Sequence, residues 1–380
     1  MQTNNRIAMV DALRGYALLG LFLVHCIERW EVFWYSPTFD GWSEAVFGLF
    51  AGKAFAVFAL LFGFSFATIM ANERARGGDF TFRFAWRMLL LLAIGTVHVT
   101  FYRGDVLQVL ALIGLLLIPL DRVRSDRLLL LLAALAFVQL PLWLRWWAAA
   151  QGADWAVARP LYDSWGDLRA LAEGSRMAVA LDNLGPGTVG KWSFFVEGGR
   201  VMEIVGLFIV GILLHRRRLF AEAAERRGTW LAIAGASAAL WALTLLVDAP
   251  MLTGTEAQAQ TADWLIGQAR NLPAMAFQVA VFVLAWSTPL RGLLALLRPA
   301  GRMTLTLYVG QSLVFAPLFY GYGLGLWDDL SNADVVLLGL GAFAAQLALA
   351  ALWFRAFRYG PLEWFWRAAT RTSLAVPFRA

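Results

Sequence analysis

Long runs of hydrophobic residues alternate with short polar segments along the whole chain. A helix needs roughly 20 predominantly apolar residues to cross the hydrocarbon core of a bilayer. Runs of about that length lie at 8–27, 46–71, 84–102, 105–120, 127–147, 199–214, 229–248, 264–288, 303–322 and 334–357. The pattern therefore predicts an all-α fold, a polytopic transmembrane helical bundle with about ten spanning helices.

Charge is distributed unevenly between the loops that connect these runs. Arginines gather in every second loop and near the C-terminus, at Arg74, Arg76, Arg83, Arg122, Arg124, Arg127, Arg216, Arg217, Arg218, Arg355 and Arg358. The alternate loops carry acids instead, at Glu28, Glu31, Asp40, Glu44, Asp328, Asp329 and Asp334. Because basic loops stay on the cytoplasmic side, the sequence predicts both termini inside the cell.

Composition narrows the class of protein further. Hydrophobic residues make up 60% of the 380 positions and charged residues 15%, against about 25% charged residues in a soluble domain. Membrane lipids are therefore the expected surroundings, and the net charge of +6 reflects the loops and not a nucleic-acid partner. With Cys26 as its one cysteine, the chain forms no internal disulfide and no multi-cysteine cluster, and we expect no metal.

One long polar segment, residues 148–198, divides the predicted domain. Five spans precede it in residues 8–147, and five follow it in residues 199–380. We expect a single transmembrane domain over residues 1–380, with this segment on the outer side. Gly185-Pro186-Gly187 predicts a break in the segment before the next span.

Ionisable residues inside the spans are costly in lipid and therefore indicate buried partners or functional sites. In the first span, Arg14 and His25 are eleven residues apart, which places them on one helix face about 16 Å apart. Asp11 lies one turn before Arg14 and shares that face. The alternative for Asp11 and Arg14 is an ion pair that anchors the start of the helix at the interface.

The third span repeats the arrangement, with Arg87 and His98 again eleven residues apart and Asp105 just after the span. His25 and His98 are thus expected at a similar depth, where Asp105 orients an imidazole. The alternatives are a basic interfacial role for Arg87 and interhelical hydrogen bonding for either histidine. Glu203, in the outer half of the sixth span, is a candidate carboxylate of a pocket.

Several motifs together resemble a known family over nearly the whole chain. They are Asp11-Ala-Leu-Arg14-Gly15, Phe58-Ala-Leu-Leu-Phe62-Gly63-Phe64, the run from Arg87 to His98, Gly104-Asp105, Gly301-Arg302-Met-Thr-Leu-Thr-Leu-Tyr308 and Gly360-Pro361-Leu362-Glu363-Trp364. This combination resembles the YeiB-like inner-membrane proteins, whose C-terminal part is domain of unknown function 418. The resemblance implies a multi-pass protein of the bacterial cytoplasmic (inner) membrane.

The first span is also similar to that of the transmembrane acyltransferases, in which an arginine precedes a histidine at the same spacing. This similarity implies transfer of an acyl group, by resemblance an acetyl group, from cytoplasmic acyl-CoA to a hydroxyl or amine acceptor at the outer side. It makes His25, His98 and Asp105 the catalytic candidates, and Arg14, Asp11, Arg87 and Glu203 the substrate-binding candidates. A small-molecule or lipid transporter without acyl chemistry, and a non-catalytic membrane scaffold, remain open.

Overall fold

The computed structural model describes residues 7–379, except for 159, 165–167, 248–251 and 253. Within these residues the regular structure is helical, and β pairing is limited to one isolated bridge between Phe357 and Arg379. The helices of the first half are α1 Ala8–Ile27, η1 Val32–Tyr35, α2 Gly41–Phe50, α3 Lys53–Arg74, α4 Thr81–Val99, α5 Leu107–Gly114, α6 Leu117–Arg122, α7 Asp126–Val138 and α8 Leu140–Ala150. The all-α prediction is confirmed.

The second half begins with the segment that divides the domain. Its helices are α9 Asp154–Val157, η2 Leu161–Ser164, α10 Leu168–Glu173, α11 Arg176–Leu184 and α12 Pro186–Glu197. The remaining helices are α13 Arg200–Arg216, α14 Arg227–Leu245, α15 Glu256–Trp286, α16 Arg291–Ala295, α17 Arg298–Arg302, α18 Thr304–Phe319, α19 Asn332–Ala356 and α20 Pro361–Arg371. The predicted break at Gly185 is present, because α11 ends at Leu184 and α12 begins at Pro186.

Seven helical stretches of the described residues are long and apolar enough to cross a membrane. They are Ala8–Tyr35, Gly41–Arg74, Thr81–Val99, Asp126–Ala150, Arg227–Leu245, Glu256–Trp286 and Asn332–Ala356. The chain is therefore a multi-pass membrane protein. The other three predicted spans are not single helices of 18 residues or more: 199–214 is α13 with 17 residues, 303–322 is α18 with 16, and 105–120 divides into α5 and α6.

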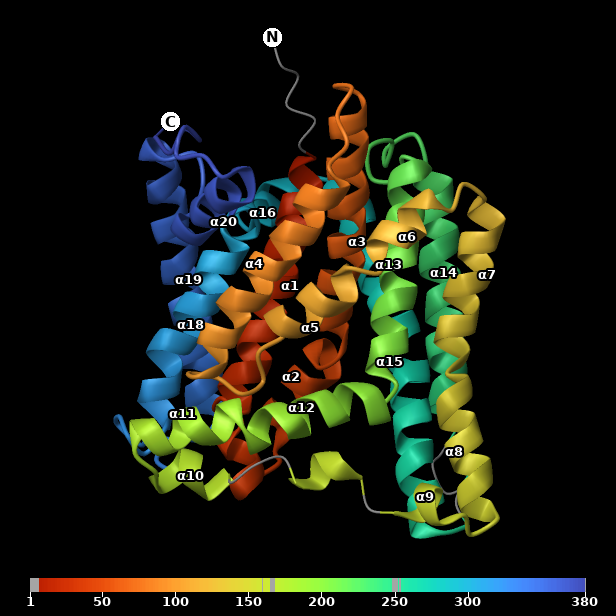
Figure 1. Ribbon diagram of the computed structural model, residues 1–380, viewed down its shortest axis with the longest axis vertical. Coiled ribbons are helices and arrows are strands. Elements are labelled where there is room, and N and C mark those ends of the chain that lie inside the picture. The colour runs from red at the N-terminus through yellow and green to blue at the C-terminus, as the bar shows by residue number, and fades with distance from the viewer. Residues whose placement is uncertain (1–6, 159, 165–167, 248–251, 253, 380) are drawn as a thin grey trace.

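The long helices run roughly side by side, and both termini lie at the same end of the bundle (Figure 1). At the opposite end, α10, α11 and α12 cross the bundle at a steep angle to the long helices (Figure 1). The segment 148–198 thus covers one end of the bundle, as expected of a loop that stays on one side. We refer below to the terminal end and to the covered end.

Local backbone breaks explain why two predicted spans are not single helices. Gly52 joins α2 to α3 with φ +75°, a left-handed conformation that glycine adopts without strain. Gln139 joins α7 to α8 with φ +59°, and Pro141, near the start of α8, cannot donate the backbone hydrogen bond that would continue α7. Each break ends one helix and begins the next within the predicted span.

Helix α1 lies at the centre of the bundle, and most of its residues are buried. It packs against α3, α17 and α19. Close approach of α3 to α13 depends on Gly63 and Gly211, where an added Cβ would lie 2.2 Å from a backbone oxygen of the other helix. The contacts of α1 with α3, α17 and α19 fix its depth relative to these neighbours, and hence the depth of His25.

Candidate active site

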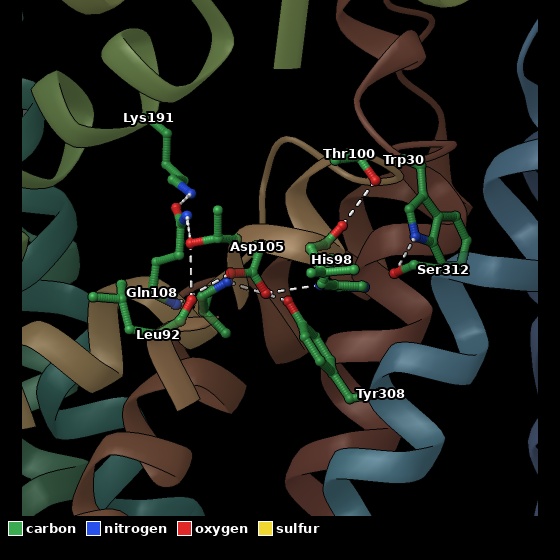
Figure 2. Close-up of polar contacts among 12 residues, drawn as sticks. Trp30, Leu92, His98, Thr100, Asp105, Gln108, Lys191, Tyr308 and Ser312 are labelled. Carbon is green, nitrogen blue, oxygen red and sulfur yellow. Dashed lines mark hydrogen bonds and ion pairs between the residues drawn. The ribbon is translucent and has the colours of Figure 1, made fainter. Parts of the chain in front are cut away.

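The end of α4 brings a histidine and a carboxylate together inside the protein. His98 occupies the last turn of α4, and Asp105 follows a short turn and precedes α5. The Nδ1 atom of His98 lies 2.8 Å from Oδ1 of Asp105 (Figure 2), and both side chains are buried. The second oxygen of Asp105 accepts a hydrogen bond from the backbone N–H of Gln108 at 3.1 Å. Asp105 is therefore held from both sides.

This pairing determines which nitrogen of His98 carries the proton. An ionised carboxylate only accepts hydrogen bonds, so the Nδ1 atom of His98 donates to Asp105 and leaves the lone pair on Nε2. The Nε2 atom is buried and has no hydrogen-bond partner among the described residues. Its lone pair is therefore not used by a side chain or backbone group of the described residues.

His25 approaches the same region from α1. The ring centroid of His25 lies 5.0 Å from that of Tyr102 and 6.2 Å from that of Tyr308. The ring of His98 lies 6.2 Å from Tyr102 and 5.2 Å from Tyr308. His25 and His98 therefore pack against the same two tyrosines, as the matching positions of the histidines on the two spans predict. Asp105 bonds to His98, whereas aromatic rings, including that of Trp30 at 5.9 Å, pack around His25.

Tyr102 is fixed by a strained turn that follows α1. Its hydroxyl donates to Oε1 of Glu31 at 3.2 Å, and burial raises its pKa well above the usual value, so the phenol stays protonated. Arg29, Trp30 and Glu31 have φ of +46°, +54° and +83°, values that side chains larger than glycine adopt at a cost. Strain of this kind persists where surrounding contacts require it, often at functional sites.

Lys191, from the segment 148–198, contacts Gln108, whose backbone N–H donates to Asp105. Nζ of Lys191, on α12, donates to Oε1 of Gln108 at 2.5 Å, and Gln108 donates to Thr96 of α4 (Figure 2). Burial lowers the pKa of Lys191 to about 8. Lys191 thus connects the segment 148–198 to the residues that hold Asp105.

Arg14 and Asp11 make structural contacts at the terminal end of α1. Arg14 pairs with Asp11 at 3.2 Å and donates to Oγ of Ser65 at 2.9 Å and to the backbone oxygen of Gly301 at 3.4 Å. These bonds connect α1 with α3 and α17. The anchoring alternative for this pair therefore has direct geometric support, while 22% of the Arg14 side chain remains exposed.

Arg87 and Glu203 interact with residues other than the two histidines. The Arg87 guanidinium stacks on the ring of Trp366 at 3.5 Å, and Trp366 donates to the backbone oxygen of Arg87 at 2.9 Å. This packing attaches α20 to α4. Glu203 is buried in the first turn of α13, where the charge of Arg200 acts on it. We therefore regard neither residue as a direct neighbour of His98.

The residues that the sequence reasoning missed come mainly from distant segments. Tyr102, Tyr308, Glu31 and Lys191 all surround the pair formed by His98 and Asp105. Tyr308 stands at the end of the motif that begins at Gly301, and its hydroxyl accepts from the backbone N–H of Val106 at 3.3 Å. That motif was the available signal, although nothing in it indicated which helix Tyr308 would face.

Fold and site together define a multi-pass helical membrane protein with a buried histidine–carboxylate pair at its centre. Residues 214–373 match the family described as protein of unknown function (DUF418). Over 98% of its length the chain is 28% identical to an uncharacterized protein, YxaH, of Bacillus subtilis (strain 168), covering 96% of that protein. It is 25% identical over 95% of its length to an uncharacterized protein, YeiB, of Escherichia coli (strain K12), covering 95% of it.

The chain is thus similar to YeiB-like proteins and contains a region that matches DUF418, which confirms the resemblance drawn from its motifs. The matched region contains Tyr308, whereas His25, His98 and Asp105 precede it. The site is therefore assembled from the DUF418 region and from the N-terminal half.

Proposed function

We propose that this protein is a membrane-embedded acyltransferase that moves an acyl group from cytoplasmic acyl-CoA to a hydroxyl or amine acceptor at the covered end. The supporting observation is the buried pair of His98 and Asp105 with its unpartnered Nε2. A carboxylate that fixes the tautomer and leaves Nε2 as the proton acceptor is the arrangement of a general base in acyl transfer.

In the proposed reaction, Nε2 of His98 removes the proton from the acceptor hydroxyl or amine as the acceptor attacks the thioester carbonyl. A new ester or amide bond forms, the carbon–sulfur bond breaks, and the imidazolium returns the proton to the departing CoA thiolate. Asp105 stabilises the imidazolium between these steps. The rings of Tyr102 and Tyr308 pack beside His98 and would form walls of the acceptor site.

The proposal includes the ten passages and the cytoplasmic location of both termini in a bacterial inner membrane. A cysteine at Leu181 of α11 should react with a membrane-impermeant maleimide in whole cells, whereas one at Leu374 should react only in broken cells. Both leucines are exposed, and the native Cys26 is buried. The opposite labelling pattern would reverse the orientation and refute the cytoplasmic donor.

The activity test uses the purified protein in lipid nanodiscs with radiolabelled acetyl-CoA, and measures released CoA thiol and labelled acceptor. We expect His98→Asn to lower the rate by about 100-fold or more, the range that a general base contributes. His215→Asn is the matched control, because His215 contacts Thr68 on α3 instead of the site.

Equal rates in the His98 variant and the wild type would refute the role of the pair. Transport is the competing function, and counterflow of a solute in liposomes with no acylated product would favour it.

A further inference from the structure

A cavity with polar and aromatic walls lies beside the turn that follows α1. Its volume is about 340 Å³, at the lower end of the range of small-molecule sites. Its walls include Arg29, Phe33, Asp40, Trp327 and Asp328. The residues come from both ends of the sequence and meet where α1, η1 and α19 adjoin.

Arg29 gives the cavity a buried, positively charged hydrogen-bond donor. It is 6% exposed, and its terminal nitrogens donate to backbone oxygens of Ile27 at 2.9 Å and Leu330 at 2.7 Å and to Oδ1 of Asn332 at 3.0 Å. Its Nε atom is buried and has no partner among the described residues. The Nη2 atom carries two N–H groups and donates to Leu330, so its second N–H can donate to an oxygen of a ligand in the cavity.

The charges around Arg29 restrict the chemistry of such a ligand. The carboxylates of Asp328 and Asp40 both act on the guanidinium, and a backbone hydrogen bond from Ser43 holds the pKa of Asp40 below its usual value. One cation and two anions leave the walls net negative, which disfavours phosphates and carboxylates. A hydroxyl group suits them, because it accepts from a guanidinium and donates to a carboxylate.

The aromatic walls complete this specificity. Phe33 is buried, and Trp327 packs edge-on against Tyr35 at 5.7 Å. An apolar C–H face stacks on such rings while the hydroxyls at its edge reach the polar walls. We propose that the cavity binds a neutral polyhydroxylated ligand of monosaccharide size, either free or as the headgroup of a glycolipid.

The cavity and the histidines share one turn. Arg29 lines the cavity, Trp30 packs against His25, and Glu31 accepts from Tyr102. A ligand in the cavity therefore contacts the segment that holds the residues around His98. Use of this ligand as the acyl acceptor rests on the proposed function, whereas its binding does not.

Binding is measured on the full chain in nanodiscs free of glycoside detergent, with no acyl-CoA present. The probes are glucose, glycerol and glucose 6-phosphate, with a glucosyl diacylglycerol incorporated in the nanodisc as a separate arm. We expect saturable binding of glucose or of the glucosyl lipid, and the arm that binds identifies the source. We expect glucose 6-phosphate to bind more weakly than glucose.

Asp328→Asn and Trp327→Ala should each weaken binding by about tenfold, equivalent to about 1.4 kcal/mol. Asp329→Asn is the matched control, since Asp329 is an exposed neighbour that does not line the cavity, and should leave binding unchanged. Absence of binding in both sugar arms, tighter binding of glucose 6-phosphate, or equal effects of the two aspartate variants would overturn the proposal. Because no donor is present, these outcomes are separate from the test of acyl transfer.

Discussion

Replacing Asp105 by asparagine removes a carboxylate that serves two buried donors at once. In the wild type, one oxygen accepts from Nδ1 of His98 at 2.8 Å and the other from the backbone N–H of Gln108 at 3.1 Å. The asparagine side chain has a single acceptor oxygen and an NH₂ group. One of the two donors must therefore lose its acceptor, although the size of the side chain is unchanged.

The cost follows from which donor is left. If the oxygen stays with His98, the buried N–H of Gln108 faces an NH₂ group, and an unsatisfied buried donor costs about 1–3 kcal/mol. If the amide turns over, its NH₂ group faces His98, and the imidazole must move its proton to Nε2 to accept from it. We therefore expect the free energy of unfolding to fall by about 1–3 kcal/mol in the first case, and the proposed base to be lost in the second.

Histidine-selective ¹⁵N labelling separates the two cases, because the chain has three histidines. Wild-type His98 should show protonated Nδ1 and unprotonated Nε2, and the variant should show either the reverse or the same tautomer with lower stability. Thermal unfolding followed by tryptophan fluorescence measures the stability. Asp126→Asn serves as the control, since its ion pairs with Arg216 and Arg217 are partly exposed and worth up to about 1 kcal/mol.

A protonated Nε2 in the wild type would refute the assignment of His98 as a base, and an unchanged tautomer and stability in Asp105→Asn would refute the geometry.

Three further predictions concern the surroundings of the pair and the C-terminal helix. Gly104→Ala should lower the free energy of unfolding by about 1–3 kcal/mol, measured by thermal unfolding, because its Cβ would lie 2.4 Å from the Tyr102 hydroxyl. Lys191 has a pKa of about 8 in the folded protein, below its ordinary 10.5, so between these pH values the unfolded chain binds one more proton and the free energy of unfolding should rise with pH. The rise should reach up to about 3 kcal/mol. It should be absent in Lys191→Met, and its persistence there would contradict the assignment. Glu363→Ala should cost about 1 kcal/mol in the same assay, because Glu363 caps α18 by accepting from the backbone N–H groups of Leu305 and Thr306 at 2.7 and 3.1 Å. An unchanged midpoint would contradict this role.

Features determined by nearby residues could be predicted from the sequence. The hydrophobic pattern predicts the first span at 8–27, and α1 runs from Ala8 to Ile27, because hydrophobic length in lipid directly sets helix length. The contact of His98 with Asp105 was also predictable, since six residues of turn separate them and the turn is closed by the backbone bond from Tyr102 to His98 at 3.1 Å. Helical spacing likewise placed His25 at a matching depth.

Features that depend on packing between distant segments could not be predicted in this way. Nothing local indicates that Tyr308 would face His98, or that Lys191 would reach Gln108 from the covering segment. The division of 105–120 into α5 and α6 also escaped the hydrophobic pattern, because apolar residues continue through the break. The turn at residues 29–31 carries no glycine, the usual signal of left-handed backbone.

The turn at residues 29–31 would be difficult to relax by mutation. Glycine at any of the three positions would relieve local strain, yet it would delete Arg29 from the cavity, Trp30 from its place beside His25, or Glu31 from its bond to Tyr102. Gains in thermal stability from such glycines would therefore be accompanied by loss of a contact. Selection for thermal stability should consequently favour glycine at positions 29–31, whereas selection for activity should retain Arg29, Trp30 and Glu31.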